Sequence, residues 1–313
     1  MEKEKEFYEK LESRGVSRRD FMKFCTFLTA TMGLSSSFVP KVAEVFAAPK
    51  QRPPVVWLHF GECTGCTEGV LRTMYPWIDE LVLDILSIEY HETIQVAAGH
   101  QAEENLQNAI KKYEGKFICV VEGGVPLKFD GGYGKIGGRT FLEIAKEVCP
   151  KAAATVAIGT CASFGGIQAA APNPGGYVGV GEAIGIKAIN LPGCPPNPIN
   201  LIGTIVNYLL LGKLPQLDDQ GRPLFAYGKT IHDQCPRRGH FENDEFVEEF
   251  GSEEARLGYC LYKVGCRGPE TYNNCATAKF HGGTSWPIQA GHPCIGCSEP
   301  NFWDRMTPFY EEL

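Results

Sequence analysis

Two cysteines three residues apart, Cys63 and Cys66, are the first residues in this sequence whose type and spacing suit metal chemistry. They follow an apolar run over residues 55–60 that is typical of a buried strand in a parallel sheet. Two thiolates at this spacing can bind one metal centre, whereas a closed zinc site or iron–sulfur cluster usually takes four ligands. We therefore expect the rest of the chain to supply further ligands.

Two more cysteines follow apolar runs in the same way. Cys161 comes after the run at residues 155–158, and Cys194 comes after the run at residues 188–191. A glycine lies shortly before each of them, which permits close backbone approach. Because parallel strands end at the same edge of a sheet, we expect Cys63, Cys66, Cys161 and Cys194 to bind one 4Fe-4S cluster. A structural zinc site would use the same residues, so spacing alone leaves zinc open.

The elements that must position these cysteines follow an alternating pattern. Short apolar runs at residues 55–60, 81–88, 117–121, 155–158 and 188–191 alternate with helical patterns at 68–75, 100–112, 140–148 and 199–211. This alternation predicts an α/β fold with a doubly wound parallel sheet over residues 49–220. Residues 221–313 have little such pattern, with at most a short acidic helix at 244–250. So irregular a segment would need cross-links, such as metal clusters, to stay folded.

The second half offers seven further candidate ligands, which divide into four and three. Three cysteines could hold a 3Fe-4S cluster without a fourth thiolate. His232 lies three residues before Cys235, at ligand spacing, in a segment that otherwise has one ligand too few. For a single histidine the alternative is an ordinary hydrogen-bonded side chain. The seven residues are His232, Cys235, Cys260, Cys266, Cys275, Cys294 and Cys297.

The N-terminus has the pattern of an export signal. Residues 2–14 are highly charged, and we expect them to be unstructured. A twin arginine, Arg18 and Arg19, precedes a short apolar run, and Ala47 or Ala48 offers a cleavage site. Residues 1–48 are therefore predicted to be a cleaved twin-arginine signal, which exports folded proteins to the periplasm. The alternative is a basic amphipathic helix that stays attached.

Composition excludes other classes of protein. The chain has 313 residues, 43% of them apolar, and a formal net charge of −7, so no basic surface is expected for nucleic acid. Its 13 cysteines are too many for core packing alone, and the odd number leaves one over in any complete set of disulfides. The apolar run of the signal is too short to span a membrane, and no apolar run follows Pro300. We therefore expect no transmembrane helix, and a soluble enzyme or one attached only through a partner.

Taken from end to end, the chain resembles the small subunit of NiFe hydrogenases. The resemblance rests on the twin-arginine segment and on five motifs in the family's order. These motifs are Glu62-Cys63-Thr64-Gly65-Cys66, Gly159-Thr160-Cys161-Ala162, Pro192-Gly193-Cys194-Pro195-Pro196, His232-Asp233-Gln234-Cys235 and Pro293-Cys294-Ile295-Gly296-Cys297. The family implies a flavodoxin-like domain followed by an irregular iron–sulfur cluster domain.

The resemblance also implies which residues bind which cluster. The proximal group is Cys63, Cys66, Cys161 and Cys194, binding 4Fe-4S. The medial group is Cys275, Cys294 and Cys297, binding 3Fe-4S, and the distal group is His232, Cys235, Cys260 and Cys266, binding 4Fe-4S. Electrons would pass between the NiFe centre of a separate large subunit and an external carrier, expected to be a multihaem c-type cytochrome.

Several single residues carry further expectations. No catalytic residue is expected in this chain, although Glu62 and Glu122 could relay protons; the alternative is that they are ordinary hydrogen-bonded carboxylates. Gly65 and Gly166 match positions where oxygen-tolerant relatives have cysteine, so the resemblance implies the oxygen-sensitive type.

Three other functions are compatible with parts of the sequence. One is a stand-alone ferredoxin-like carrier, which would contain no nickel and need no partner. Another is the cluster-bearing subunit of a quinone-reductase complex, which does not account for the medial group or for His232. The third is a disulfide-rich exported binding protein, which would contain no iron.

The resemblance generates one prediction at Pro287, which matches the position of a fourth medial cysteine in selenium-containing relatives. Proline cannot bind iron, which favours a three-iron cluster. We expect Pro287→Cys to convert the medial cluster to 4Fe-4S and to lower its potential, because the added thiolate completes four ligands. EPR of the oxidised variant checks this, and an unchanged 3Fe signal would contradict it.

Overall fold

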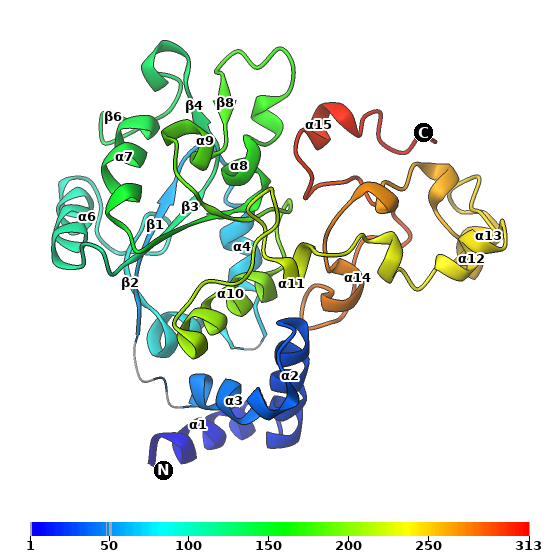
Figure 1. Ribbon diagram of the computed structural model, residues 1–313, viewed down its shortest axis with the longest axis horizontal. Coiled ribbons are helices and arrows are strands. Elements are labelled where there is room, and N and C mark those ends of the chain that lie inside the picture. Colours follow the sequence, from blue (N-terminus) through cyan, green and yellow to red (C-terminus); the bar gives the residue numbers. More distant parts are fainter. Residues whose placement is uncertain (1, 48, 50–51, 75, 313) are drawn as a thin grey trace.

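A five-stranded parallel sheet lies at the centre of the first two thirds of the chain (Figure 1). The structure is a computed structural model that describes residues 2–47, 49, 52–74 and 76–312. The sheet order is β2-β1-β3-β7-β9, and every neighbouring pair is parallel. In order along the chain this is 2-1-3-4-5, the flavodoxin-like order, so the predicted doubly wound sheet is confirmed. The strands are β1 (Pro54–His59), β2 (Ser87–His91), β3 (Ile118–Glu122), β7 (Ala154–Ile158) and β9 (Ile189–Leu191).

Both faces of the sheet are buried. Val55 and Trp57 of β1 point into one apolar cluster, whereas Val56 and Leu58 point into the other, as the two-residue period of a strand requires. The first cluster includes residues of α4 (Gly65–Leu71) and α10 (Pro198–Leu211). The second includes residues of α6 (His100–Lys112), α7 (Phe141–Val148) and α9 (Val180–Ile184). Cover on both faces explains why β1, β3 and β7 are mostly apolar, whereas the edge strand β2 contains polar residues.

The helix ends follow from local chemistry. Thr140 and Glu143 form a reciprocal capping box at the start of α7. The side chain of Asn197 caps α10, which begins with Pro198 and ends where Gly212 adopts a φ of +63°. The observed bounds of α6 equal the predicted ones, because its buried residues recur at helical spacing.

Four sequence predictions of local structure were wrong in part. The run at 81–88 is not one strand: residues 81–85 form a π-helical turn and β2 begins at Ser87, since a continuous apolar run does not distinguish helix from strand. The helix predicted at 68–75 is α4, which begins and ends earlier, and Tyr75 lies outside the described residues. Residues 244–250 are not helical, because the backbone of Val247 bonds to Cys260 instead.

The fourth error concerns the N-terminus. Residues expected to be unstructured form α1 (Glu2–Ser13), whose Leu11 is buried and whose Lys5 and Glu9 pair one turn apart. The helices α2 (Arg18–Thr31) and α3 (Val39–Ala47) follow, and both contact α10 (Figure 1). We call α1, α2 and α3 the N-terminal helices. The cleavage position after Ala47 is at the end of α3, whereas Ala48 lies outside the described residues.

Beyond residue 221 the described chain contains short helices and isolated bridges but no strand of a sheet. This agrees with the predicted irregular structure, although the domain boundary at residue 220 stays an interpretation.

The remaining helices are α5 (Ile78–Glu80), α8 (Gly159–Phe164), α11 (Leu224–Tyr227), α12 (Arg238–Glu242), α13 (Glu253–Leu257), α14 (Cys275–Ala278) and α15 (Phe302–Arg305). The remaining strands are β4 (Val125–Pro126), β5 (Lys135–Ile136), β6 (Arg139–Thr140) and β8 (Tyr177–Val178). The short turns are η1 (Ser36–Phe38), η2 (Leu81–Ile85), η3 (Lys128–Gly131), η4 (Cys149–Lys151), η5 (Ile167–Ala169), η6 (His232–Gln234), η7 (Tyr262–Val264) and η8 (Gly268–Glu270).

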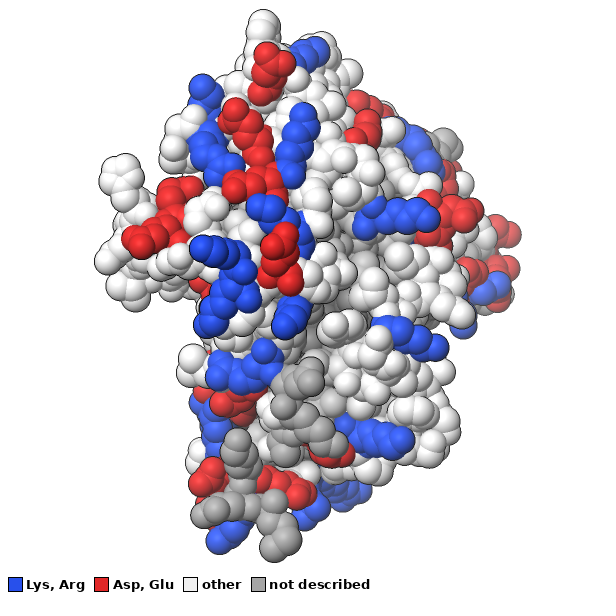
Figure 2. Space-filling model, turned by 60° about the vertical axis from the view of Figure 1, so that its left-hand side comes forward, with Lys and Arg blue, Asp and Glu red and all other residues white. Residues whose placement is uncertain are grey.

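The surface carries charges of both signs. Figure 2 shows lysine and arginine side chains interspersed with aspartate and glutamate over the face in view, with no basic stripe there. In the part of the chain that the structure describes, no helix combines the length and apolar composition that crossing a bilayer requires.

A buried ion pair joins the two parts of the chain. The Arg222 guanidinium contacts Asp218 at 2.8 Å and Glu299 at 2.9 Å, and Glu299 also accepts a hydrogen bond from the backbone of Tyr272. Arg222 and Glu299 are both buried. Their pairing fixes the C-terminal segment against the loop that follows α10.

We expect Glu299→Leu to lower the free energy of unfolding by about 3 kcal/mol, because it leaves part of the buried Arg222 charge uncompensated. The double variant Arg222→Met with Glu299→Leu should be milder, since it removes both charges. Thermal unfolding of the full chain measures the difference. A double variant that melts below the single one would contradict this account.

Candidate metal centres

The proximal group lies at the edge where β1, β7 and β9 end. Cys66 is in the first turn of α4, Cys161 is in α8, and Cys194 is in the loop between β9 and α10. Burial raises the pKa of the Cys66 thiol well above its usual range, and the charges of Glu122, Cys161, Cys194 and Cys63 raise it further. The structure therefore brings the four predicted cysteines into electrostatic contact.

Two glycines fit closely around these sulfurs. A Cβ atom added at Gly159, whose φ is +85°, would overlap the Sγ atom of Cys66. One added at Gly166, whose φ is +75°, would overlap the Sγ and the backbone of Cys161. Glycine suits both positions because the backbone approaches the sulfurs closely in a left-handed conformation, and a side chain at Gly166 would require Cys161 to shift.

The set of donors fits an iron–sulfur cluster. All 13 cysteines are described, and each is a free thiol. Cys63 and Cys194 are exposed whereas Cys66 and Cys161 are half-buried, so the proximal group opens onto the surface of this chain. Four free thiols beside a glycine-lined edge suit a cluster bound by thiolates.

Glu122 holds the loop that carries Cys66. This buried carboxylate accepts hydrogen bonds from the backbone of Cys66 at 3.0 Å and of Thr67 at 3.1 Å, and from the Thr67 hydroxyl at 2.5 Å. The Trp57 indole donates a further bond at 3.3 Å. Glu122 therefore lies at the edge that carries the proximal group, and its bonds show a positioning role.

Sequence reasoning missed a histidine that joins the two predicted carboxylates. His59 Nδ1 lies 3.1 Å from Glu62 Oε1 and 3.9 Å from Glu122 Oε2, and its Nε2 lies 3.4 Å from His91 Nδ1. Burial, together with the nearby His59, lowers the pKa of His91 to about 3. His59 ends the apolar strand β1, so its only available sign was a polar residue in an otherwise buried run. His91 ends β2, which contains other polar residues and gave no such sign.

The medial group lies inside the second half. Burial raises the pKa of the Cys275 thiol well above its usual range, and Cys297 and Cys294 raise it further. The Cys294 thiol lies 3.6 Å from the Thr271 hydroxyl. The three cysteines predicted to form this group therefore lie together, beside the buried Trp286.

Pro287 does not face the medial group directly. Its side chain is exposed, whereas the neighbouring Trp286 and Ile288 are buried in the apolar cluster that packs on Cys275 and Cys294. A cysteine at this position would have to turn inward before it could bind iron.

The proximal and medial groups are directly connected. Burial raises the pKa of the Cys297 thiol to about 11, while a hydrogen bond from the backbone of Cys194 lowers it. The Thr160 hydroxyl donates to the carbonyl of Cys297 and accepts a hydrogen bond from the backbone of Gly193 at 2.9 Å. These bonds fix the second half of the chain against the edge of the sheet.

The distal group surrounds one cavity. His232, Cys235, Cys260 and Cys266 all line it, together with apolar residues and two arginines, Arg237 and Arg238. Burial raises the pKa of Cys266 to about 11, and Cys260 and Cys235 raise it further. The His232 ring packs edge-on against Phe241 at 4.7 Å.

The remaining cysteines lie outside these groups. Cys119 and Cys149 are buried with their sulfurs 3.8 Å apart, and Cys25 is buried in α2. All three act as small apolar residues of the core, outside the ligand groups.

Comparisons with known proteins agree with this geometry. Residues 227–310 match the family of C-terminal regions of the NiFe/NiFeSe hydrogenase small subunit, and residues 63–208 match NADH ubiquinone oxidoreductase, 20 Kd subunit. The chain is 54% identical to the periplasmic [NiFe] hydrogenase small subunit 1 of Nitratidesulfovibrio vulgaris, over 97% of this chain and 96% of that one. It is 52% identical to the quinone-reactive Ni/Fe-hydrogenase small chain of Wolinella succinogenes, over 97% and 86%.

A solved structure is also similar. The reduced Ni-Fe-Se hydrogenase of Desulfomicrobium baculatum contains a chain with a TM-score of 0.79 and 36% identity, covering 84% of this chain and all of that one. Fold, thiol groups and relatives together define a cluster-bearing subunit of an oxidoreductase. Within that class, the chain belongs to the small subunits of NiFe hydrogenases, which work with a large subunit.

The contacts of the two glycines generate a prediction. We expect Gly159→Ala to lose about four iron atoms per chain, the content of one cubane cluster, because the added methyl overlaps the Sγ atom of Cys66. Gly65→Ala is the matched control. Its Cβ would lie 3.1 Å from the Cys63 sulfur, in a helix with ordinary φ, so a small shift accommodates it. Iron analysis of both purified variants decides, and equal iron contents would contradict the prediction.

Proposed function

We propose that this chain holds two 4Fe-4S clusters and one 3Fe-4S cluster, bound by the proximal, distal and medial groups respectively. When bound, these clusters would carry single electrons between the NiFe centre of the large subunit and an external acceptor. The supporting observation is the unbroken series of contacts between the groups. The backbone of Cys194 bonds to Cys297 of the medial group, and the backbone of Cys294 in the medial group bonds to Cys266 of the distal group.

The chain's own residues hold the ligands in place. Glu122 and Thr67 fix the loop of Cys66, Thr160 fixes Cys297, and Thr271 contacts Cys294. Burial raises the thiol pKa values, so the thiolates form only when a metal compensates their charge. Thiolate clusters in such surroundings have potentials set by burial and hydrogen bonds.

The distal group is proposed as the exit. His232 is half-buried and lies beside exposed Arg238, so this end of the series approaches the surface. A neutral imidazole in place of a thiolate makes the cluster less negative, which favours its reduced form. The proposed acceptor is a multihaem c-type cytochrome.

Glu62, His59 and Glu122 are proposed to move protons beside the proximal group. Their ligand atoms all lie within 4.8 Å of one another, and Glu62 Oε2 is buried with no hydrogen-bond partner among the described residues. An unpaired buried oxygen is free to receive a proton from a neighbouring group.

Residues 1–48 are proposed to be a cleaved twin-arginine signal and the site of action to be the periplasm, followed by domains at 49–220 and 221–313. Arg18 and Arg19 are exposed at the start of α2, where an export receptor could reach them. The relative from Nitratidesulfovibrio vulgaris is named as a periplasmic protein.

Metal analysis of the purified complex with its large subunit tests the cluster assignment. We expect nickel, and about eleven iron atoms in the three clusters in addition to the catalytic iron. Zinc at the proximal group, or a complex with no nickel, would overturn the proposal.

A variant tests the exit separately. We expect His232→Ala to slow electron delivery to a cytochrome roughly tenfold or more while hydrogen isotope exchange at the catalytic centre stays largely intact. His240→Ala is the matched control, because His240 stacks on Tyr259 nearby but lies outside the ligand set. Equal loss of both activities in the His232 variant would count against this role.

A further inference from the structure

The N-terminal helices are packed into the body of the protein. In α2, Cys25 and Leu28 are fully buried, and in α3, Val42 and Phe46 are buried as well. All four belong to the same apolar cluster as the sheet residue Val55. The apolar part of the export signal is therefore covered, although the twin arginine beside it is exposed.

Charged side chains also hold the N-terminal helices against the rest of the protein. The Arg14 guanidinium makes two hydrogen bonds to Asp79, of 2.9 and 2.7 Å, and lies 4.8 Å from the centre of the Trp77 ring. Lys10 adds an ion pair with Asp79 at 3.0 Å. A bidentate pair reinforced in this way is stronger than a single exposed ion pair.

The surface under these helices is apolar. The residues of α10 from Ile199 to Asn207 are buried on every side of the helix, because the sheet covers one side and the N-terminal helices contact another. This contact is close: a Cβ added at Gly203 would lie 3.7 Å from Cδ1 of Leu28, an ordinary packing distance. A helix with apolar residues on several faces requires cover on each of them. Removal of the signal would uncover this face of α10.

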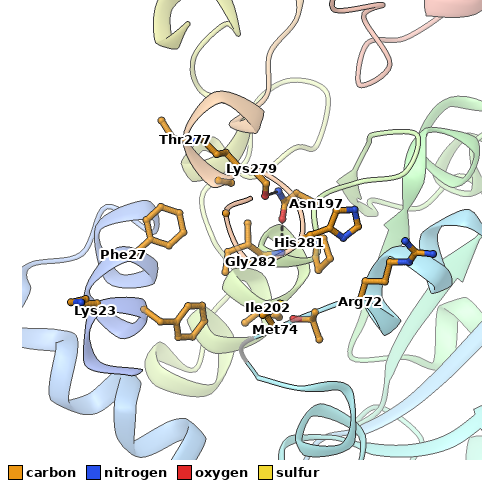
Figure 3. A pocket seen from close by; sticks show the side chains of 16 residues that line it. Lys23, Phe27, Arg72, Met74, Asn197, Ile202, Thr277, Lys279, His281 and Gly282 are labelled. Atoms are coloured by element: carbon orange, nitrogen blue, oxygen red, sulfur yellow. Dashed lines mark hydrogen bonds between the residues drawn. The ribbon is translucent and has the colours of Figure 1, made fainter. Parts of the chain in front are cut away.

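The covered face adjoins the proximal group. A hollow separates part of α2 from the body, and its walls include Arg72, Met74 and Asn197, which follow Cys66 and Cys194 closely in the chain. Figure 3 shows Lys23 and Phe27 of α2 on one side of this hollow and Arg72 and His281 on the other. Phe27, Leu71 and Met74 are exposed apolar residues in this region.

We propose that the N-terminal helices occupy, in the unassembled chain, the apolar face that is buried against the large subunit in the heterodimer. The inference rests on the proposed function. A subunit that exchanges electrons with the proximal group must bind beside it, where α2 and the start of α10 lie. Docking of the N-terminal helices and binding of the large subunit then exclude each other.

Limited proteolysis of the full-length precursor tests this exclusion. The N-terminal helices should be cleaved slowly in the chain alone and at least tenfold faster once purified large subunit is bound. Asp79→Ala should raise cleavage in the chain alone by roughly threefold to tenfold, the effect of losing one bidentate ion pair. Glu253→Gln is the control, because its pair with Arg256 lies in α13 and touches no N-terminal helix.

The outcomes separate the two proposals. A large subunit that binds while the N-terminal helices stay equally protected would overturn the inference and leave the proposed function intact. A large subunit that does not bind at all would overturn both. Rapid cleavage of the wild-type chain alone would also overturn the inference, because the helices would then not be docked in solution.

Discussion

All five strands of the central sheet run parallel, and this constraint determines where the chemistry lies. Because β1, β7 and β9 end at one edge, the thiols that follow them meet there although they come from positions as far apart as 63 and 194. The glycines at 159 and 166 allow the backbone to approach the sulfurs. Glu122, at the end of β3, then fixes the loop of Cys66 through the same edge. Sheet topology thus prepares a site for four thiolates before any metal binds.

The second half depends on that edge. It has no sheet of its own among the described residues, and its apolar cluster is small and includes Cys266. The ion pair of Arg222 with Glu299 and the bond from Thr160 to Cys297 tie it to the first half. Clusters that cross-link residues distant in sequence would supply stability that so small a core does not provide.

The outer side of α10 needs cover both while the N-terminal helices are present and after they are removed. As part of the folded precursor, the outer side of α10 is covered by α2 and α3. If the signal is removed, that apolar side needs another cover, and the large subunit is the partner that the family supplies. The same apolar surface can therefore link assembly to export.

The sequence by itself determined the class of fold, because apolar runs and helical periods are local properties. Cysteines that follow predicted strands suggested the proximal group, whereas the resemblance implied which residues share each cluster. Local sequence patterns did not distinguish helix from strand or loop at residues 81–88 and 244–250, which produced the errors there. The charge-rich composition of residues 2–14 predicted an unstructured segment where the structure has the helix α1. Only the tertiary structure decided which residues surround the thiols. His59 joins Glu62 to Glu122, Thr160 joins two ligand groups, and Leu28 packs beside Gly203. These contacts join residues distant in sequence, and no periodic pattern encodes them, because they arise only when separate elements pack together.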